Sequence, residues 1–257
     1  MNKPTILVTG ATSGIGRATC ILLAQRIPEC TIIAAGRRDE RLQELKQTIE
    51  SETSSRCITL SLDVRNQKDV EEKLSSNKEF KLEDIDILIN NAGLAAGLST
   101  VDEGSIDHWE RMIDTNVKGL LYVSKPIVSA MKKKRTGHII NLSSVAGKDA
   151  YTGAAVYCAT KFGVEAITRA MRQELVAYNI KVSSIAPGAV NTEFSQVRFD
   201  GDKEKADKVY IGFDPLYAED IAECILFILT APDHVNIADM TILPKSQADS
   251  RMIHKEL

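Results

Sequence analysis

Three residues in the middle of the chain have the types and the spacing needed for acid–base chemistry on an alcohol or a carbonyl group. Tyr157 and Lys161 are four residues apart in a segment with a helical pattern, and Ser144 stands thirteen residues before the tyrosine. Residues four apart on a helix share a face, so we expect the Lys161 ammonium near the Tyr157 phenol. A nearby cation lowers the pKa of a tyrosine from its usual value of about 10, which makes it a candidate proton donor and acceptor. Such pairs also occur on ordinary solvated helix faces, so the rest of the chain decides their meaning.

A glycine-rich turn follows the first predicted strand. Thr9–Gly16 reads TGATSGIG, and its three glycines would let the backbone approach a pyrophosphate at the start of the next helix. The GxxxGxG spacing differs from the usual GxGxxG fingerprint, and the alternative is a turn that needs small residues for packing. A position directly after an N-terminal strand favours a dinucleotide site. We assign the cofactor to Gly10, Thr12, Ser13, Gly14, Ile15 and Gly16.

Two arginines at the end of the second predicted strand indicate which dinucleotide binds. Arg37 and Arg38 follow that strand, and no acidic residue stands at the strand end before Asp39. An NAD site usually has an acidic group here for the ribose 2′-hydroxyl, whereas guanidinium groups match phosphate oxygens. The pattern predicts NADP, with Arg37 favoured over Arg38. The alternative is a pair of solvated cations.

Composition excludes several classes of partner. The 257 residues are 44% hydrophobic and 26% charged with a net charge of −3, so neither nucleic acid nor a membrane surface is expected to bind. The five cysteines are widely spaced, without a CxxC motif, which predicts a reducing compartment, the cytoplasm, and no metal site. A strand starting at Thr5 leaves no room for a signal peptide, and no apolar run reaches membrane-spanning length. The last four residues, His254–Leu257, are similar to an endoplasmic-reticulum retrieval signal. Because such a signal needs an entry signal to act, we interpret the similarity as a coincidence.

Short apolar segments alternate with longer amphipathic ones along the whole chain. Strands are predicted at 5–9, 31–35, 58–62, 85–90, 138–142, 182–186 and 240–243, and helices at 16–26, 39–51, 106–133, 154–178 and 218–230. The pattern predicts an α/β fold: one Rossmann-type, doubly wound parallel sheet of about seven strands with helices on both faces, in a single domain, 1–257. Residues 188–217 lack clear periodicity and follow the sixth strand, so we expect a substrate-specificity loop there.

Taken together, these motifs resemble the short-chain dehydrogenase/reductase family over nearly the whole chain. The motifs are Thr9–Gly16, Asp63-Val64, Asn90–Gly93, Asn116, Ser144, Tyr157 with Lys161, and Pro187-Gly188. The resemblance implies that Tyr157 is the general acid in carbonyl reduction and the general base in alcohol oxidation. It also implies that Ser144 hydrogen-bonds the substrate oxygen and that Lys161 lowers the tyrosine pKa and binds the nicotinamide ribose. Asn116 would hold a helix open for a water on the path to Lys161.

The same resemblance implies further cofactor contacts. Asp63, followed by Val64, would face the adenine amino group, and Asn90 would line the adenosine ribose. Val190 and Thr192 would contact the carboxamide. The family pattern adds Ala92, Gly93, Pro187 and Gly188. Each of these residues taken alone could equally be a cap or turn residue.

The second half of the chain resembles a narrower group, the NADP-dependent 3-hydroxy acid dehydrogenases. Residues 147–151, 185–188 and 193–199 carry this similarity. It implies oxidation of small molecules such as L-serine or allo-threonine. Because such substrates carry a carboxylate, we expect a cation in the site, and Arg198 is the candidate; an exposed loop arginine is an equal alternative.

Other functions stay open from the sequence. A 3-oxoacyl carrier-protein reductase should show a basic surface, and a steroid or retinoid reductase a more apolar 188–217 segment; a sugar is a further possible carbonyl substrate. A non-catalytic NADP-binding regulatory protein would typically lose a member of the catalytic tetrad, and this chain keeps all four. The family resemblance also implies a homotetramer assembled through helices 106–133 and 154–178.

Overall fold

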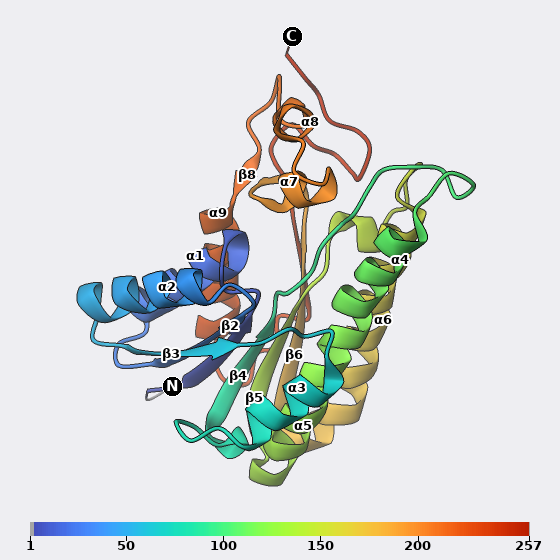
Figure 1. Ribbon diagram of the computed structural model, residues 1–257. Coiled ribbons are helices and arrows are strands. Elements are labelled where there is room, and N and C mark those ends of the chain that lie inside the picture. Colours follow the sequence, from blue (N-terminus) through green and yellow to red (C-terminus); the bar gives the residue numbers. More distant parts are fainter. Residues whose placement is uncertain (1–2, 257) are drawn as a thin grey trace.

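The short apolar segments pair side by side because their residues are hydrophobic on both faces. The computed structural model describes residues 3–256 and contains a seven-stranded sheet in the order β3-β2-β1-β4-β5-β6-β9, all parallel (Figure 1). The strands are β1 (Thr5–Thr9), β2 (Thr31–Gly36), β3 (Arg56–Ser61), β4 (Ile85–Asn90), β5 (Gly137–Leu142), β6 (Ile180–Pro187) and β9 (Asp239–Ile242). The chain builds outward from β1 in one direction and from β4 in the other. This reversal is the place where such sheets bind ligands.

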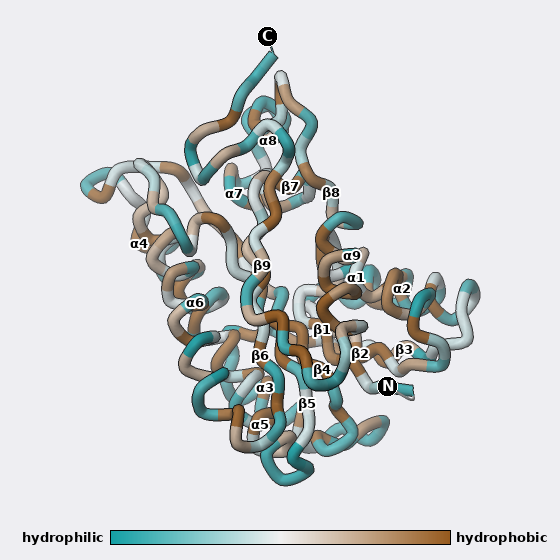
Figure 2. Tube along the Cα trace, turned by 180° about the vertical axis from the view of Figure 1, so that it is seen from behind, coloured by the Kyte–Doolittle hydropathy of each residue, from teal (hydrophilic) through white to brown (hydrophobic). Residues whose placement is uncertain are grey.

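Helices cover both faces of the sheet, as predicted. One layer holds α1 (Gly14–Arg26), α2 (Asp39–Glu52) and α9 (Ala218–Thr230), and the other holds α3 (Gln67–Ser75), α4 (Ile106–Ile113), α5 (Leu120–Lys134) and α6 (Ala155–Leu175). Ile6 and Val8 of β1 pack toward the first layer, while Leu7 between them packs toward the second. The hydrophobic stretches accordingly run along the central strands and α9 in Figure 2, with hydrophilic residues in the outer loops.

The predicted helix over 106–133 is divided in the structure. A π-helical turn, Asp114–Gly119, separates α4 from α5, and Pro126 lies inside α5, which continues past it. The short helix α3 was not predicted. Among the helices of residues 3–256, none combines the length and the apolar character that crossing a bilayer requires.

Residues 188–217, which we call the lid, contain more regular secondary structure than the sequence predicted. They contain β7 (Val190–Asn191), α7 (Phe194–Arg198), α8 (Lys203–Lys208) and β8 (Leu216–Tyr217), and β7 pairs with β8 in parallel. Figure 1 shows α7 and α8 beyond the carboxyl ends of the strands, beside the C-terminal segment. That segment is bonded to the lid, since Glu256 N donates to Gly212 O at 2.7 Å. Leu257, the end of the retrieval-like tetrapeptide, lies outside the described residues.

A buried histidine on β5 makes stability depend on pH. His138 Nε2 lies 2.9 Å from Ser183 Oγ, and burial, aided by the charge of Lys181, lowers the His138 pKa from 6.5 to about 3. Below about pH 6.5 the unfolded chain binds a proton that the folded chain does not bind until about pH 3. The stability contributed by neutral His138 is therefore lost progressively as the pH falls between these two values.

We expect His138→Gln to weaken this pH dependence. The free energy of unfolding of the wild type should fall more steeply than that of the variant, by up to about 1.4 kcal/mol per pH unit. Urea unfolding at several values between about pH 7 and about pH 5 measures both slopes. Parallel slopes would show that His138 does not govern this loss.

Candidate active site

A cavity of about 340 Å³ opens at the carboxyl ends of the strands, at the switch point between β1 and β4. Most residues predicted from the sequence line it. They are Gly10, Thr12, Ser13, Gly14, Ile15, Arg37, Arg38, Asp63, Val64, Ala92, Gly93, Ser144, Tyr157, Lys161, Pro187, Gly188, Val190 and Thr192. Segments far apart in the sequence thus converge on one site, as parallel strands that end at one edge require. The other predicted residues, Gly16, Asn90, Asn116 and Arg198, are not part of its lining.

The glycine-rich turn forms the floor of the cavity. Gly10 and Gly14 have φ angles of +68° and +49°, which disfavour any other residue. A Cβ on Gly10 would lie 2.8 Å from Asn91 Nδ2, and a Cβ on Gly16 would collide with the Gly10 carbonyl oxygen. Gly16 therefore supports the turn from behind. The turn leads into α1, whose first amides have no partner within the helix and are suited to an anion.

The two neighbouring asparagines after β4 have different roles from those predicted. The side chain of Asn90 is buried, and its Nδ2 donates to Ser124 Oγ and Asn141 Oδ1, both at 2.9 Å. The expectation that Asn90 lines the ribose site is therefore corrected. Asn91 lines the cavity instead, and its Nδ2 donates to Thr9 O at 2.9 Å and Gly10 O at 3.2 Å.

Tyr157 and Lys161 are both buried, and burial is the largest cause of the shift in each pKa. Burial raises the pKa of Tyr157 to about 12, opposed by the charge of Arg198 and a hydrogen bond from Ser144. Burial also lowers the pKa of Lys161 to about 8, and Lys161 Nζ donates to Leu142 O at 2.8 Å. Lys161 is not among the groups that shift the Tyr157 pKa in the protein alone, so its expected effect on that pKa stays a prediction. Arg198 is the cation that acts on the phenol here.

Asn116 lies at the centre of the π-helical turn and ties it to two neighbouring segments. Its Oδ1 accepts from Leu94 N, its Nδ2 donates to Leu94 O, both at 2.8 Å, and Nδ2 also donates to Thr160 Oγ1 at 3.0 Å. Wider helical turns of this kind are frequent at functional sites. A Cβ on Gly93 would lie 3.2 Å from Asn116 Oδ1 and 3.5 Å from Lys161 Nζ, so the three residues are packed together.

Arg65 was not singled out from the sequence, but it lies at the site. Arg65 lines the cavity and grips Asp63 through Nε and Nη2, the shortest contact being 2.6 Å. Hydrogen bonds from Arg65 are the main cause that holds the pKa of Asp63 below its usual value, although burial opposes them. The short separation in sequence was the available signal, since a carboxylate and a guanidinium two residues apart can meet across a turn.

Arg198 lies beside the cavity, over the reacting tyrosine. Its guanidinium carbon is 5.1 Å from the centre of the Tyr157 ring and 5.6 Å from that of Phe194, and Nη2 donates to Tyr151 Oη at 2.9 Å. Its Nε is buried and has no hydrogen-bond partner within residues 3–256. Phe194, which packs on Tyr157 at 5.9 Å between ring centres, was not singled out from the sequence.

The residues at the cavity fit a nicotinamide dinucleotide. Glycines at positive φ leave the backbone amides open to a pyrophosphate, and Arg37 and Arg38 stand at the end of β2, where a 2′-phosphate would lie. Tyr157, Ser144 and Lys161 line the same cavity on its other side.

Comparison with known proteins shows the family of this chain. The short chain dehydrogenase family model matches residues 4–203. The chain belongs to this family. An NADP-dependent 3-hydroxy acid dehydrogenase from Schizosaccharomyces pombe is 41% identical over 257 residues, covering 100% of this chain and 98% of the relative. The NADP-dependent 3-hydroxy acid dehydrogenase YdfG from Salmonella typhi is 44% identical over 246 residues, covering 95% of this chain and 96% of the relative.

Solved structures show the same relationship. The closed form of a serine dehydrogenase complexed with NADP+ superposes with a TM-score of 0.88 at 41% identity, covering 98% of this chain and 100% of that one. A levodione reductase, with a TM-score of 0.82 and 24% identity over 97% of both chains, shares the fold. The catalytic tetrad Asn116, Ser144, Tyr157 and Lys161 stays a prediction from the motifs of this sequence.

Proposed function

We propose that the protein transfers a hydride between NADP and the hydroxyl-bearing carbon of a small 3-hydroxy acid such as L-serine or allo-threonine. The reverse reaction is the reduction of a semialdehyde or a 3-oxo acid. The position of Arg198 over the ring of Tyr157 carries this proposal, because it puts a cation within reach of a carboxylate near the reacting oxygen. The relatives named as NADP-dependent 3-hydroxy acid dehydrogenases and the serine dehydrogenase structure support it.

The protein residues handle the proton and the oxygen of the substrate, while NADP, when bound, supplies the hydride chemistry. Tyr157 gives its phenolic proton to the substrate oxygen in reduction and takes it back in oxidation. Ser144, which acts to lower the Tyr157 pKa, would hold the same oxygen where charge develops. Burial keeps Tyr157 protonated at neutral pH, so oxidation needs the cations around it to lower its pKa.

Arg198 is proposed to bind the substrate carboxylate. Tyr151 fixes one side of the guanidinium, and the buried, unpaired Nε leaves a donor for a ligand. A carboxylate two carbons from the reacting carbon would reach this donor while its hydroxyl faces Tyr157 and Ser144. The lid would then select the substrate within one dinucleotide-binding and catalytic domain.

A substrate panel tests the proposed function. Purified protein should oxidise L-serine, allo-threonine or 3-hydroxyisobutyrate with NADP+ at a higher kcat/KM than with NAD+, and D-serine in the panel reports the stereochemical preference. The Tyr157→Phe variant should bind NADP+ as the wild type does and lose turnover by about a hundredfold or more. A wild type that prefers NAD+, or that oxidises none of these acids, would contradict the proposal.

The role of Arg198 is tested by comparing charged and uncharged substrates. In Arg198→Ala, the KM for L-serine should rise by about tenfold or more, since a charged hydrogen bond is lost, while the KM for an uncharged alcohol should change much less. Arg198→Lys is the matched variant and should recover part of the affinity without the geometry of the guanidinium fork. Equal effects on both substrates would contradict the proposal that Arg198 binds the substrate carboxylate.

The assembly is proposed to be a homotetramer built on α5 and α6. One face of α6 carries Phe162, 43% exposed, in line with four exposed alanines, and α5 adds Leu121, 43% exposed. The alanines are Ala155, Ala159, Ala166 and Ala170. A continuous apolar face of small residues on a surface helix suits close packing against another helix.

Light scattering in solution should give the wild type the mass of four chains. Phe162→Glu should lower that mass, because it puts a charge into the apolar face, while Phe162→Leu should leave it unchanged. A wild-type monomer would refute the assembly.

A cytoplasmic location is the remaining part of the proposal. The five cysteines are free, and four of them are buried. A chain with unpaired thiols suits a reducing compartment. Recovery of the native protein from a membrane or secreted fraction would overturn this.

A further inference from the structure

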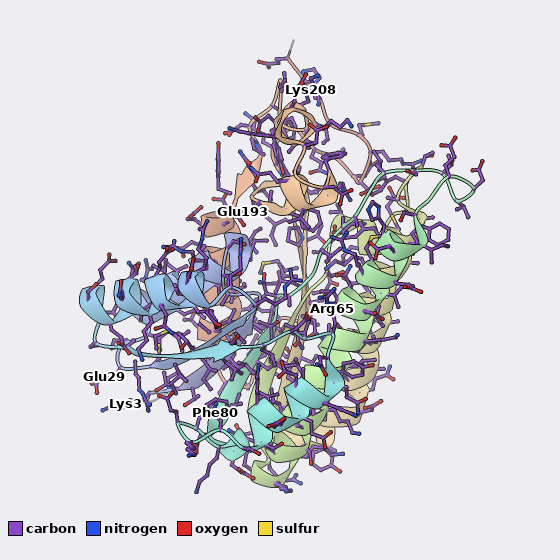
Figure 3. The ribbon with its side chains drawn as sticks, viewed as in Figure 1. Lys3, Glu29, Arg65, Phe80, Glu193 and Lys208 are labelled. Carbon is purple, nitrogen blue, oxygen red and sulfur yellow. The ribbon has the colours of Figure 1, made fainter. Side chains whose placement is uncertain are left out.

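An ion pair joins the lid to the opposite wall of the cofactor cavity, and the proposed chemistry does not use it. Arg38, after β2, and Glu193, before α7, both line the cavity, and Arg38 Nη1 donates to Glu193 Oε2 at 2.9 Å. Figure 3 places Glu193 at the foot of α7, on the side of the molecule that holds α1 and α2. The pair therefore bridges two elements that are 155 residues apart.

Neighbouring contacts hold both partners of this bridge. Arg38 Nε and Nη2 grip Thr12 Oγ1 at 3.2 and 3.1 Å. Burial tends to raise the pKa of Glu193, but hydrogen bonding to Arg38, the Arg38 charge and a hydrogen bond from Ser13 hold it below its usual value. A Cβ on Gly14 would touch the side chain of Thr192 at 3.3 Å. Residues 192–193 of the lid thus lie against the glycine-rich turn.

Arg37 differs from Arg38 in having its donors open. The Arg37 side chain is exposed and lines the cavity. Within residues 3–256 it makes no hydrogen bond and no ion pair. Three nitrogen atoms of Arg38 already donate hydrogen bonds to Thr12 and Glu193. A 2′-phosphate therefore finds unoccupied donors on Arg37 and mostly occupied ones on Arg38.

We propose that Arg38 and Glu193 form a clasp that closes the lid over the cofactor and slows its release. The 2′-phosphate is then left to Arg37, the residue that the sequence already favoured. This inference rests on the proposed use of NADP. Because the clasp joins protein to protein, its loss should affect cofactors with and without the phosphate alike. A phosphate ligand would instead affect only the phosphorylated cofactor.

The test measures dissociation rates and Kd for NADPH and NADH with the full chain, by cofactor fluorescence and displacement. In Glu193→Gln and Arg38→Ala, both cofactors should leave about two- to fivefold faster, with the ratio of the two Kd values unchanged. The double variant should be no weaker than either single one, since each removes the same pair. At about 1 M salt the differences from wild type should shrink, because the pair is half exposed.

Two further variants serve as controls. Glu204→Gln removes a carboxylate from the same lid, but one that pairs with Lys208 on α8, so it should change neither rate. Arg37→Ala should weaken NADPH by about tenfold or more and NADH by less than about twofold.

Three results would overturn the clasp. Tighter binding of NADPH alone in Glu193→Gln would show that the carboxylate competes with the phosphate. Weaker binding of NADPH alone in Arg38→Ala would make Arg38 a phosphate ligand. Unchanged rates for both cofactors would remove any role in retention. Failure of the wild type to bind either cofactor would refute the proposed use of NADP itself, which is a different result from all three.

Discussion

The site depends on how closely the backbone approaches itself where β1 and β4 end. Asn91 bonds the carbonyls of Thr9 and Gly10, and any side chain at Gly10 or Gly16 would displace it or the turn. This contact fixes the direction in which α1 leaves the sheet, so its amides face the cavity. The same strand ends deliver Gly93 against Asn116 and Lys161, which joins the cofactor side to the reacting side.

Burial acts on the two titrating groups in opposite directions and favours the neutral form of each. It raises the pKa of Tyr157 to about 12 and lowers that of Lys161 to about 8. In the protein alone, the phenol therefore carries its proton at neutral pH and holds it more tightly than a free tyrosine does. The polar groups that oppose burial at the phenol, Arg198 and Ser144, are also the groups proposed to hold the substrate. Substrate binding and proton transfer thus share one set of interactions.

The sequence predicted what depends on local pattern and missed what depends on distant partners. The seven strands were found because buried parallel strands are apolar on both faces. Asn90 was assigned to the ribose from the family resemblance, and only the neighbours of each side chain show that Asn90 is bonded inside the fold while Asn91 faces the cavity. The π-helical turn follows from bonds between Asn116 and Leu94, 22 residues away, and the clasp from residues 155 apart. Periodicity contains no information about either.

The lid connects cofactor retention to substrate recognition through a very short element. Glu193 and Arg198 flank and end α7, a single five-residue helix, so one contacts the cofactor wall and the other the reacting tyrosine. A helix this short has no internal hinge, and its two ends must move together. Holding Glu193 against Arg38 therefore also holds Arg198 over Tyr157. The proposed clasp would thus keep both the cofactor wall and the proposed carboxylate site in place through one rigid element.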